Sequence, residues 1–232
     1  MTVESFTPAR ARADLLAAIK VHVPFDGWSE ESFRAAIADT GLDDAVARVA
    51  CPRGATDLAL AFHEEGDAAM VTRLAQDAST LADLRFRDRI ATAVRYRLEA
   101  VDDKELVRRG TTLLSLPHLA ADGAQALWGT CDAIWTALGD RSDDINWYTK
   151  RATLSGVYGS TVLYWLGDDS TNHQATWEFL DRRIENVMQF EKLKATVNDN
   201  PVLKRVFAGP IWLAARVKAP TKPNTNAWPP LT

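Results

Sequence analysis

The stretch HLAADGAQALWGTCDAIWTAL, residues 118–138, carries the pattern that decides the fold class. Apolar side chains recur in it every three or four residues, which places them on one face of an α-helix. These side chains are Leu127, Cys131, Ile134 and Leu138. Residues 171–197 repeat the pattern with Trp177, Leu180, Ile184 and Val187. Because runs of alternating β-branched residues are absent, the sequence predicts an all-α fold.

Residues that start and stop helices divide the rest of the chain into segments. Ser29 can cap the start of a helix, and Thr40-Gly41 can end it. Pro117 separates the helix before the quoted stretch from the stretch itself, because proline interrupts a helix interior. The expected helices cover residues 8–23, 29–40, 43–50, 55–78, 81–100, 104–116, 118–138, 147–166 and 171–197.

The composition excludes several classes of protein. With 232 residues, 47% of them hydrophobic and 25% charged, the chain resembles a globular protein that builds its core without disulfides or metals. Cys51 and Cys131 form no CxxC pair, and we expect both to be buried thiols. Residues 1–20 lack the apolar core of an export signal, and no stretch approaches the roughly 18 apolar residues that a membrane span needs. Any membrane contact is therefore expected to be peripheral.

No arrangement of residues indicates catalysis. The Glu-x-x-His pairs of a di-iron bundle are absent, as are the nucleophile elbow, the Walker loop and the dinucleotide-binding glycine pattern. The run from His63 to Asp67 resembles a zinc protease motif but lacks its second histidine. Acidic pairs such as Asp168-Asp169 fall at expected helix starts, where they complement the helix dipole. We therefore expect no enzyme, with no catalytic residue, metal or cofactor.

The order of the helices matches that of a one-component transcriptional regulator. Three short helices precede a larger helical body, and in such regulators the third helix enters the major groove of DNA. Residues 1–80 hold 7 Lys and Arg against 13 Asp and Glu, a net charge of 7 − 13 = −6. The third helix opens with Asp43-Asp44. Since DNA readers need basic surfaces, we expect no nucleic-acid binding, although a TetR-like regulator with a hydrophobic ligand remains the alternative.

The C-terminal segment has one apolar and one cationic side on a helical wheel. Residues 186–222 hold 7 Lys and Arg against 2 Asp and Glu, the asymmetry expected of a contact with an anionic membrane. The expected membrane-binding residues are Lys204, Arg205, Phe207, Ile211, Trp212, Leu213 and Arg216. The alternative, a helix that docks on the protein core, stays open. The tail of residues 219–232 is expected to be flexible.

Six blocks of sequence resemble one family. They are GWSEE (27–31), CPRGATDL (51–58), GDRSDDINWYTKRA (139–152), VYGST (157–161), DDS (168–170) and TWEFLDRRI (176–184). Together they resemble, in the right order, the family named for the ninth COQ protein, which acts in ubiquinone biosynthesis in mitochondria and alphaproteobacteria. The block that contains Asn146-Trp147-Tyr148 is the most specific of the six.

The resemblance implies a TetR-like fold without DNA binding. Residues 1–54 would form a degenerate helix-turn-helix module, 55–200 a lipid-binding body, 201–218 an amphipathic helix and 219–232 a flexible tail. The body would hold a phospholipid or an isoprenoid quinone intermediate in a hydrophobic cavity, and the chain would form a homodimer. The expected location is the bacterial cytoplasm, at the surface of the inner membrane.

The resemblance also implies a partner and a surface patch. The family presents the quinone intermediate to the di-iron demethoxyubiquinone hydroxylase, through residues around the Asn-Trp-Tyr block. Carried over to this chain, that patch is Asp143, Asn146, Trp147, Tyr148, Arg151, Leu154 and Tyr158. A tryptophan and an arginine one turn apart have the composition of an interface hot spot. The pattern alone would equally fit a Trp147 that is buried as a hydrophobic staple.

Overall fold

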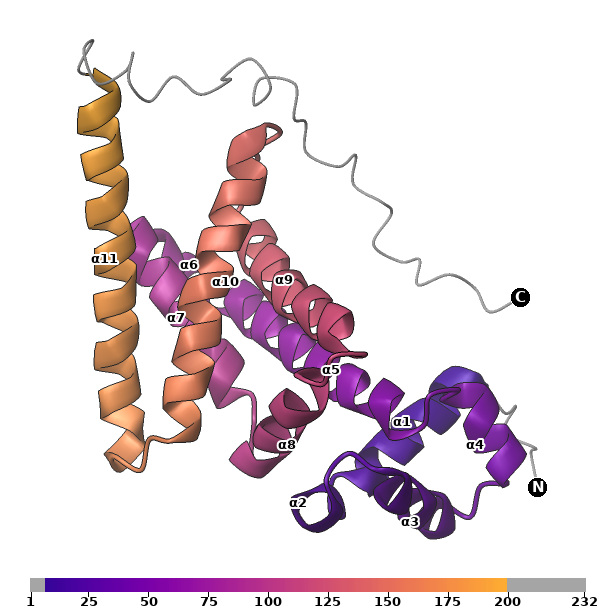
Figure 1. Ribbon diagram of the computed structural model, residues 1–232. Coiled ribbons are helices and arrows are strands. Elements are labelled where there is room, and N and C mark those ends of the chain that lie inside the picture. The colour runs from indigo at the N-terminus through magenta and orange to yellow at the C-terminus, as the bar shows by residue number, and fades with distance from the viewer. Residues whose placement is uncertain (1–6, 200–232) are drawn as a thin grey trace.

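The computed structural model describes residues 7–199, with side chains from 7 to 189. Every regular element in that range is a helix, as the sequence predicted. Figure 1 shows short N-terminal helices at one end of the molecule and a body of longer helices beyond them. The elements are α1 (Pro8–Ile19), α2 (Val23–Asp26), α3 (Glu30–Thr40), α4 (Asp44–Ala50), α5 (Ala55–Gln76), α6 (Ala78–Ala82), α7 (Phe86–Glu99), α8 (Lys104–Leu114), α9 (Ala120–Ala137), α10 (Ile145–Leu166), the 3-10 turn η1 (Thr171–His173) and α11 (Gln174–Asp199).

Local hydrogen bonds fix the ends of the N-terminal helices. The side chain of Ser29 accepts from the backbone N–H of Ser32 in a reciprocal capping box, which starts α3. Gly41 ends α3 in the left-handed conformation, with φ of 65°. The side chain of Asp43 accepts from the backbone N–H of Ala45 and starts α4. These caps confirm the predicted bounds of α3 and α4.

Other predicted bounds are wrong. The helix expected over residues 8–23 ends at Ile19, and the separate turn α2 follows, because Pro24 has no N–H to donate to a continuing helix. The last helix does not begin at residue 171. Asn172 and His173 have φ values of 52° and 56°, which a right-handed helix excludes, so α11 starts after them.

Residues 7–189 form two hydrophobic cores, and α5 contributes to both. The first third of α5 packs Leu58 against Leu15 of α1 and Phe33 of α3 in the N-terminal module. Its last part packs Met70 into the core of the body, which also contains Ile134 of α9. Figure 1 shows α5 running from the module into the body, where α10 lies between α9 and α11. The module is therefore built onto the body through a shared helix.

Helix α8 packs loosely compared with its neighbours. Leu106 is its only fully buried residue. Hydrogen bonds hold α8 at its start: Nζ of Lys104 donates to the carbonyl of Trp165 at 2.9 Å, and Nε1 of Trp28 donates to the carbonyl of Leu106 at 3.0 Å. The apolar face of α8 therefore remains open to the interior of the body.

Candidate functional site

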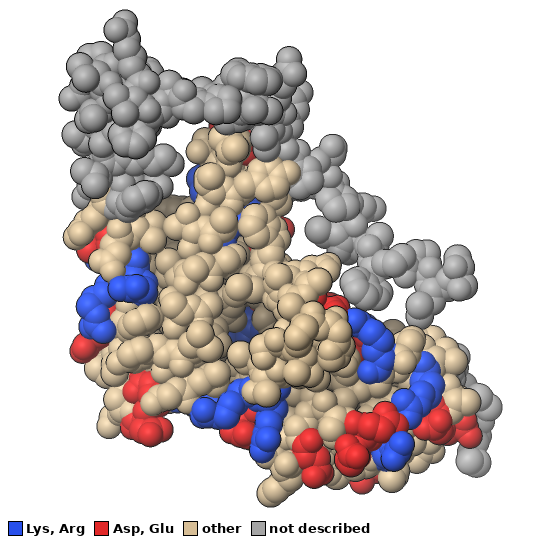
Figure 2. Space-filling model, viewed as in Figure 1, with Lys and Arg blue, Asp and Glu red and all other residues tan. Residues whose placement is uncertain are grey.

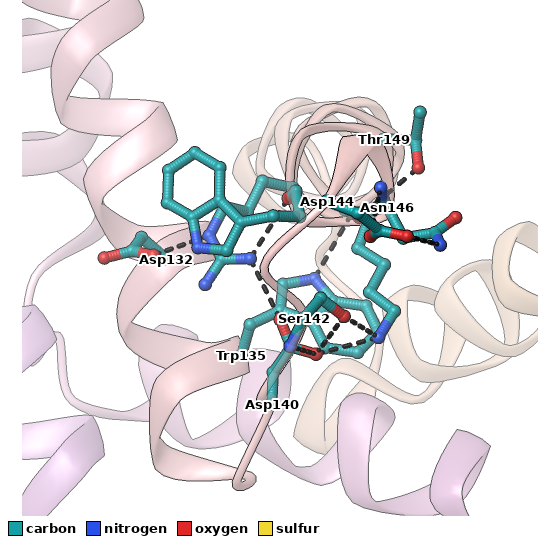
Figure 3. Close-up of polar contacts among 10 residues, drawn as sticks. Asp132, Trp135, Asp140, Ser142, Asp144, Asn146 and Thr149 are labelled. Atoms are coloured by element: carbon teal, nitrogen blue, oxygen red, sulfur yellow. Dashed lines mark hydrogen bonds and ion pairs between the residues drawn. The ribbon is translucent and has the colours of Figure 1, made fainter. Parts of the chain in front are cut away.

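A buried arginine ties the start of α10 to the loop before it. Nε of Arg151 donates to Asp132 of α9 at 2.5 Å, and Nη1 donates to Asp140 of the loop at 3.1 Å. Nη1 also donates to the carbonyl of Trp147 at 3.0 Å. Figure 3 shows these carboxylates converging from α9 and from the loop. Because its side chain is only 2% exposed, Arg151 acts as an internal brace.

A lysine closes the same loop from the other side. Nζ of Lys150 donates to Asp140 and to Oγ of Ser142, both at 2.7 Å (Figure 3). Nε1 of Trp135 donates to the carbonyl of Lys150 at 3.2 Å. Although burial disfavours the charge of Asp140, hydrogen bonds from Lys150, Ser142 and Arg151 lower its pKa to about 2. The loop is thus held in one conformation by charge-assisted hydrogen bonds.

Aromatic side chains cover this brace. The guanidinium carbon of Arg151 lies 4.0 Å from the ring centroid of Trp147, a cation–π contact. The ring of Trp147 packs edge-on against Tyr148 at 4.8 Å between centroids and lies 5.9 Å from that of Trp128. These contacts restrict the rotamer of Trp147, so a partner would meet a rigid aromatic surface.

The residues of the predicted patch differ in exposure. Asp143 and Asn146 are exposed, and Trp147 and Tyr148 are half-buried. The other three, Arg151, Leu154 and Tyr158, are buried at 2%, 4% and 4% exposure. A surface patch of all seven is therefore a prediction that the structure corrects. These residues follow one another at a spacing of three or four along α10, and those after Trp147 face the interior of the body. Arg151, Leu154 and Tyr158 therefore lie beneath the surface residues.

The predicted membrane-binding residues lie outside the described residues. They are Lys204, Arg205, Phe207, Ile211, Trp212, Leu213 and Arg216. No helix in residues 7–199 is long and apolar enough to cross a membrane.

The body contains an apolar cavity of about 320 Å³ between α5, α7, α8, α9 and α10. Its walls include Phe62, Val107, Leu114, Leu127 and Val162. The open face of α8 forms one side of it, and Figure 2 shows a hollow on this side of the molecule. Its volume and apolar lining are typical of a site for a small hydrophobic ligand.

Polar side chains meet at one wall of the cavity, and we call them the polar cluster. They are His63 and Asp67 of α5, Arg97 of α7, Thr130 of α9 and Tyr158 of α10. Nε of Arg97 donates to Asp67 at 2.6 Å, and the hydroxyl of Thr130 donates to Asp67 at 2.9 Å. Within this cluster His63, Arg97 and Tyr158 line the cavity.

The polar cluster was not predicted from the sequence. One signal was available, because Arg97 stands three residues after Val94 and four after Ala93, on the apolar stripe of α7. A charged residue at a core position must be paired, so this position indicates a buried polar site. The spacing gave no indication of the carboxylate that pairs with it, since Asp67 comes from another helix.

A second cavity lies beside the predicted patch. It has a volume of about 430 Å³ and lies between α7, α10 and α11. Asn146 and Leu154 of the patch line it, together with Ile90, Val157 and Ile184. The surface around Trp147 is therefore continuous with an apolar recess.

Other kinds of site find little support in the described residues. Among them, no group of three or more histidine, cysteine or acidic side chains could hold a metal ion. Burial raises the pKa of each thiol, Cys51 and Cys131, to about 11, so both stay protonated and unreactive at neutral pH.

The N-terminal module shows an acidic surface where a regulator would meet DNA. Asp43 and Asp44 stand at the start of α4. The guanidinium of Arg48, the basic residue of this helix, pairs with Glu30 of α3. In Figure 2 acidic side chains lie among basic ones over this end of the molecule. The two carboxylates at the start of α4 are unfavourable neighbours for a phosphate group.

An all-helical body behind short N-terminal helices is the architecture of TetR-type proteins. A crystal structure of a TetR transcriptional regulator from Nitrosomonas europaea superposes with a TM-score of 0.62, covering 76% of this chain and 97% of that one. The two sequences are 17% identical, so the likeness concerns the fold alone. The protein therefore has an all-α, TetR-like fold, as the sequence predicted.

Comparison of sequences defines the family. Residues 120–191 match the COQ9 family model. The chain is 30% identical over 183 residues to the mitochondrial ubiquinone biosynthesis protein COQ9 of Bos taurus, which covers 75% of this chain and 56% of the bovine protein. For COQ9 of Drosophila melanogaster the identity is 32% over 185 residues, covering 78% and 56% of the two chains. The chain is thus a COQ9 homologue, which confirms the family that its sequence indicated. It spans just over half the length of these relatives.

Proposed function

We propose that this chain acts in ubiquinone biosynthesis as a non-enzymatic lipid-binding protein. It holds an isoprenoid quinone intermediate in the body and offers it to a hydroxylase at the membrane. The pathway is inferred from the similarity to COQ9 proteins, which are named ubiquinone biosynthesis proteins. We choose an accessory role over an enzymatic one because of the residues that line the cavity. Among them, His63 and Tyr158 are the candidates for acid–base catalysis. The hydroxyl beside His63 is that of Thr130, which donates to Asp67 instead of to the imidazole, and no group of the described residues could hold a metal ion.

The cavity is the observation that carries this proposal. Five helices enclose about 320 Å³, and most of the lining side chains are apolar. Apolar cavities of this kind recruit apolar ligands, since water gains little by occupying them. Helix α8 forms one wall of the cavity but has few buried side chains. A ligand can therefore enter when α8 alone moves, without unfolding of the body.

The start of α10 supports the second half of the proposal. Trp147 is partly exposed and is held by Arg151 and Tyr148, so little entropy is lost when a partner covers it. Asp143 and Asn146 stand beside it as a polar rim. A half-exposed tryptophan with such a rim is typical of an interface hot spot. We propose that this reduced patch contacts a demethoxyubiquinone hydroxylase-type enzyme.

A homodimer and a peripheral contact with the inner membrane of a bacterium complete the proposal. The outer side of α10 and α11 carries apolar side chains that a second copy would cover. Leu163 is 64% exposed, and Tyr164, 39% exposed, stacks on Phe179 at 4.4 Å between ring centroids. The membrane contact is assigned to residues 201–218 on their sequence pattern.

The proposed function is tested by the lipids that accompany the purified protein. Native mass spectrometry, followed by organic extraction, should detect a bound quinone or phospholipid. Gly159→Leu is the variant that blocks the cavity, because Gly159 lines it. A Cβ at this position would lie 3.7 Å from the nearest atom of Leu127, an ordinary van der Waals contact. The larger side chain should fill the cavity and remove the bound lipid. A lipid-free wild type that takes up nothing from liposomes would overturn the proposal.

The alternative of a TetR-like regulator has the fold in its favour. The acidic start of α4 and the pairing of Arg48 with Glu30 oppose it. A gel shift at about 50 mM salt, where electrostatic binding to DNA is strong, distinguishes the two. We expect no shifted DNA, and a salt-dependent, sequence-specific shift would favour the regulator.

A further inference from the structure

The polar cluster holds a buried arginine whose hydrogen bonds are incomplete. Arg97 is 4% exposed. Its Nε donates to Asp67 at 2.6 Å and its Nη2 to the carbonyl of His63 at 3.0 Å. Its Nη1 donates to no acceptor within residues 7–189. This nitrogen is not fully enclosed by protein, because Arg97 lines the cavity, and it can therefore donate to a ligand there.

The surrounding residues place this arginine at the cavity. A Cβ at position 66 would lie 2.5 Å from Nη1 of Arg97. Because Gly66 has no side chain, the guanidinium can pack directly against the backbone of α5. Among the described residues, Arg97 is the one lysine or arginine that lines the cavity. The chain thus accommodates a charged group at the wall of an otherwise apolar space.

The hydrogen bonds of the cluster determine what kind of ligand fits. Asp67 accepts from both Arg97 and Thr130, so the charge of Arg97 is already balanced. Since the hydroxyl of Thr130 donates to Asp67, its oxygen accepts from Nε2 of His63, at 2.8 Å. Burial and the charge of Arg97 lower the pKa of His63 and keep the imidazole neutral at pH 7. Burial raises the pKa of Tyr158 to about 12, so its hydroxyl keeps its proton.

We propose that the polar cluster binds the oxygen-bearing ring of a quinone, with Nη1 of Arg97 and the hydroxyl of Tyr158 donating to its oxygens. This proposal rests on the proposed function, because it names the group of the ligand that enters the cavity first. A neutral ring oxygen suits a site whose charges cancel, whereas a phosphate would bury an uncompensated charge. The quinone ring supplies the acceptor that Nη1 lacks.

The rest of the cavity fits the isoprenoid tail. Apolar residues of α8, among them Val107 and Leu114, also line the cavity. Leu163 lines the cavity and is 64% exposed, so the space reaches the surface there. A volume of about 320 Å³ lies near the lower end of the range for ligand cavities, which fits a ring and the first part of one chain better than a two-chain phospholipid.

The test compares two prenylated rings, one with the ring oxygens and one without them. Isothermal titration calorimetry of the full chain measures Kd for a ubiquinone with one isoprene unit and for a prenylated benzene that lacks the ring oxygens. The main variant is Tyr158→Phe, which removes one hydroxyl at constant volume. Its matched control is Tyr164→Phe, because Tyr164 stacks on Phe179 and does not line the cavity. Arg97→Lys retains the charge for Asp67 but loses the forked guanidinium. Gly159→Leu reports on the cavity itself.

We expect the wild type to bind the quinone at least tenfold more tightly than the hydrocarbon. Tyr158→Phe and Arg97→Lys should each weaken quinone binding about five- to tenfold, the loss of one buried hydrogen bond, and leave hydrocarbon binding unchanged. Tyr164→Phe should change neither. If both ligands bind equally and Gly159→Leu abolishes both, the ring contact is refuted and the lipid-binding function stands. If neither ligand binds the wild type, or Gly159→Leu has no effect, the proposed function itself is refuted.

Discussion

The start of α10 and the polar cluster each contain a buried arginine, and their surroundings differ in one respect. Arg151 pairs with two carboxylates, Asp132 and Asp140, and stacks on Trp147. Arg97 pairs with one carboxylate, Asp67, and lies over a glycine at the wall of a cavity. The first arginine thus supports an outer surface, and the second borders an interior space. The same residue type thus braces a loop beneath a surface tryptophan in one region and lines an apolar cavity in the other.

The largest expected effect comes from removing the first arginine. Arg151→Met leaves Asp140, whose side chain is 3% exposed, with Lys150 as its remaining basic partner. Breaking one side of a buried ion pair should lower the free energy of unfolding by about 3 kcal/mol. Urea denaturation measures this change. Arg182→Met, at an exposed position of α11, is the control and should change stability by less than about 0.5 kcal/mol. Equal stability of both variants would show that Arg151 is no brace.

Removing the aromatic cover should affect binding more than folding. Trp147→Ala is expected to weaken association with a demethoxyubiquinone hydroxylase-type enzyme by about 2 kcal/mol, roughly thirtyfold in Kd. Uptake of quinone into the cavity should stay unchanged, because Trp147 does not line it. Surface plasmon resonance measures the first effect, with Trp177→Ala, a half-buried tryptophan of α11, as the control. A sharp drop in melting temperature on Trp147→Ala, with unchanged association, would assign this residue to the fold.

A glycine substitution tests whether the second arginine needs the space that it occupies. Gly66→Ala places a Cβ 2.5 Å from Nη1 of Arg97, so the guanidinium must move away from Asp67. Although alanine favours helix, the overpacking should lower the free energy of unfolding by about 1–2 kcal/mol. Gly156→Ala is the matched control, since nothing lies within 4 Å of its Cβ, and it should raise stability by about 0.5–1 kcal/mol. Stabilisation by both substitutions would mean that Arg97 moves freely.

The last expected effect appears in acid. The hydrogen bonds of Asp140 lower its pKa from 3.8 to about 2, so the folded state favours the carboxylate. Its contribution to stability is therefore complete above about pH 5 and is lost as the pH falls through 2. The difference in stability between the wild type and Asp140→Asn should shrink across this range. Urea denaturation at several pH values measures it, and a difference independent of pH would contradict the network around Arg151.

The two regions also show what the sequence could and could not predict. Local signals predicted local structure: Ser29, Gly41 and Asp43 fixed the bounds of α3 and α4 through bonds to near neighbours. The sequence suggested Trp147 and Arg151 as one surface pair, because their spacing of four residues puts both on one helix face. One helical turn after Trp147, this face of α10 is covered by α9, so Arg151 is buried. Which turn is covered depends on Asp132 of another helix, which spacing along α10 does not reveal.

The cavity depended even more on tertiary structure. Its lining comes from five helices, and the sequence indicated only that a family with this fold would have one. The positive φ values of Asn172 and His173, which set the direction of α11, likewise had no signal in the sequence, since asparagine and histidine adopt many conformations. The family resemblance predicted the fold class because it draws on the order of motifs over much of the chain.

The central claim, that the body holds an isoprenoid quinone in the cavity beside Arg97, is tested most directly by photo-crosslinking. A short-chain ubiquinone with a diazirine on its isoprenoid tail is bound to the full-length protein and irradiated, and the labelled peptides are identified by mass spectrometry. We predict labels on the cavity-lining residues of α8 and α10, such as Val107, Leu114 and Val162, and their loss in Gly159→Leu. Labels confined to other surfaces, or unchanged labelling in Gly159→Leu, would contradict the account.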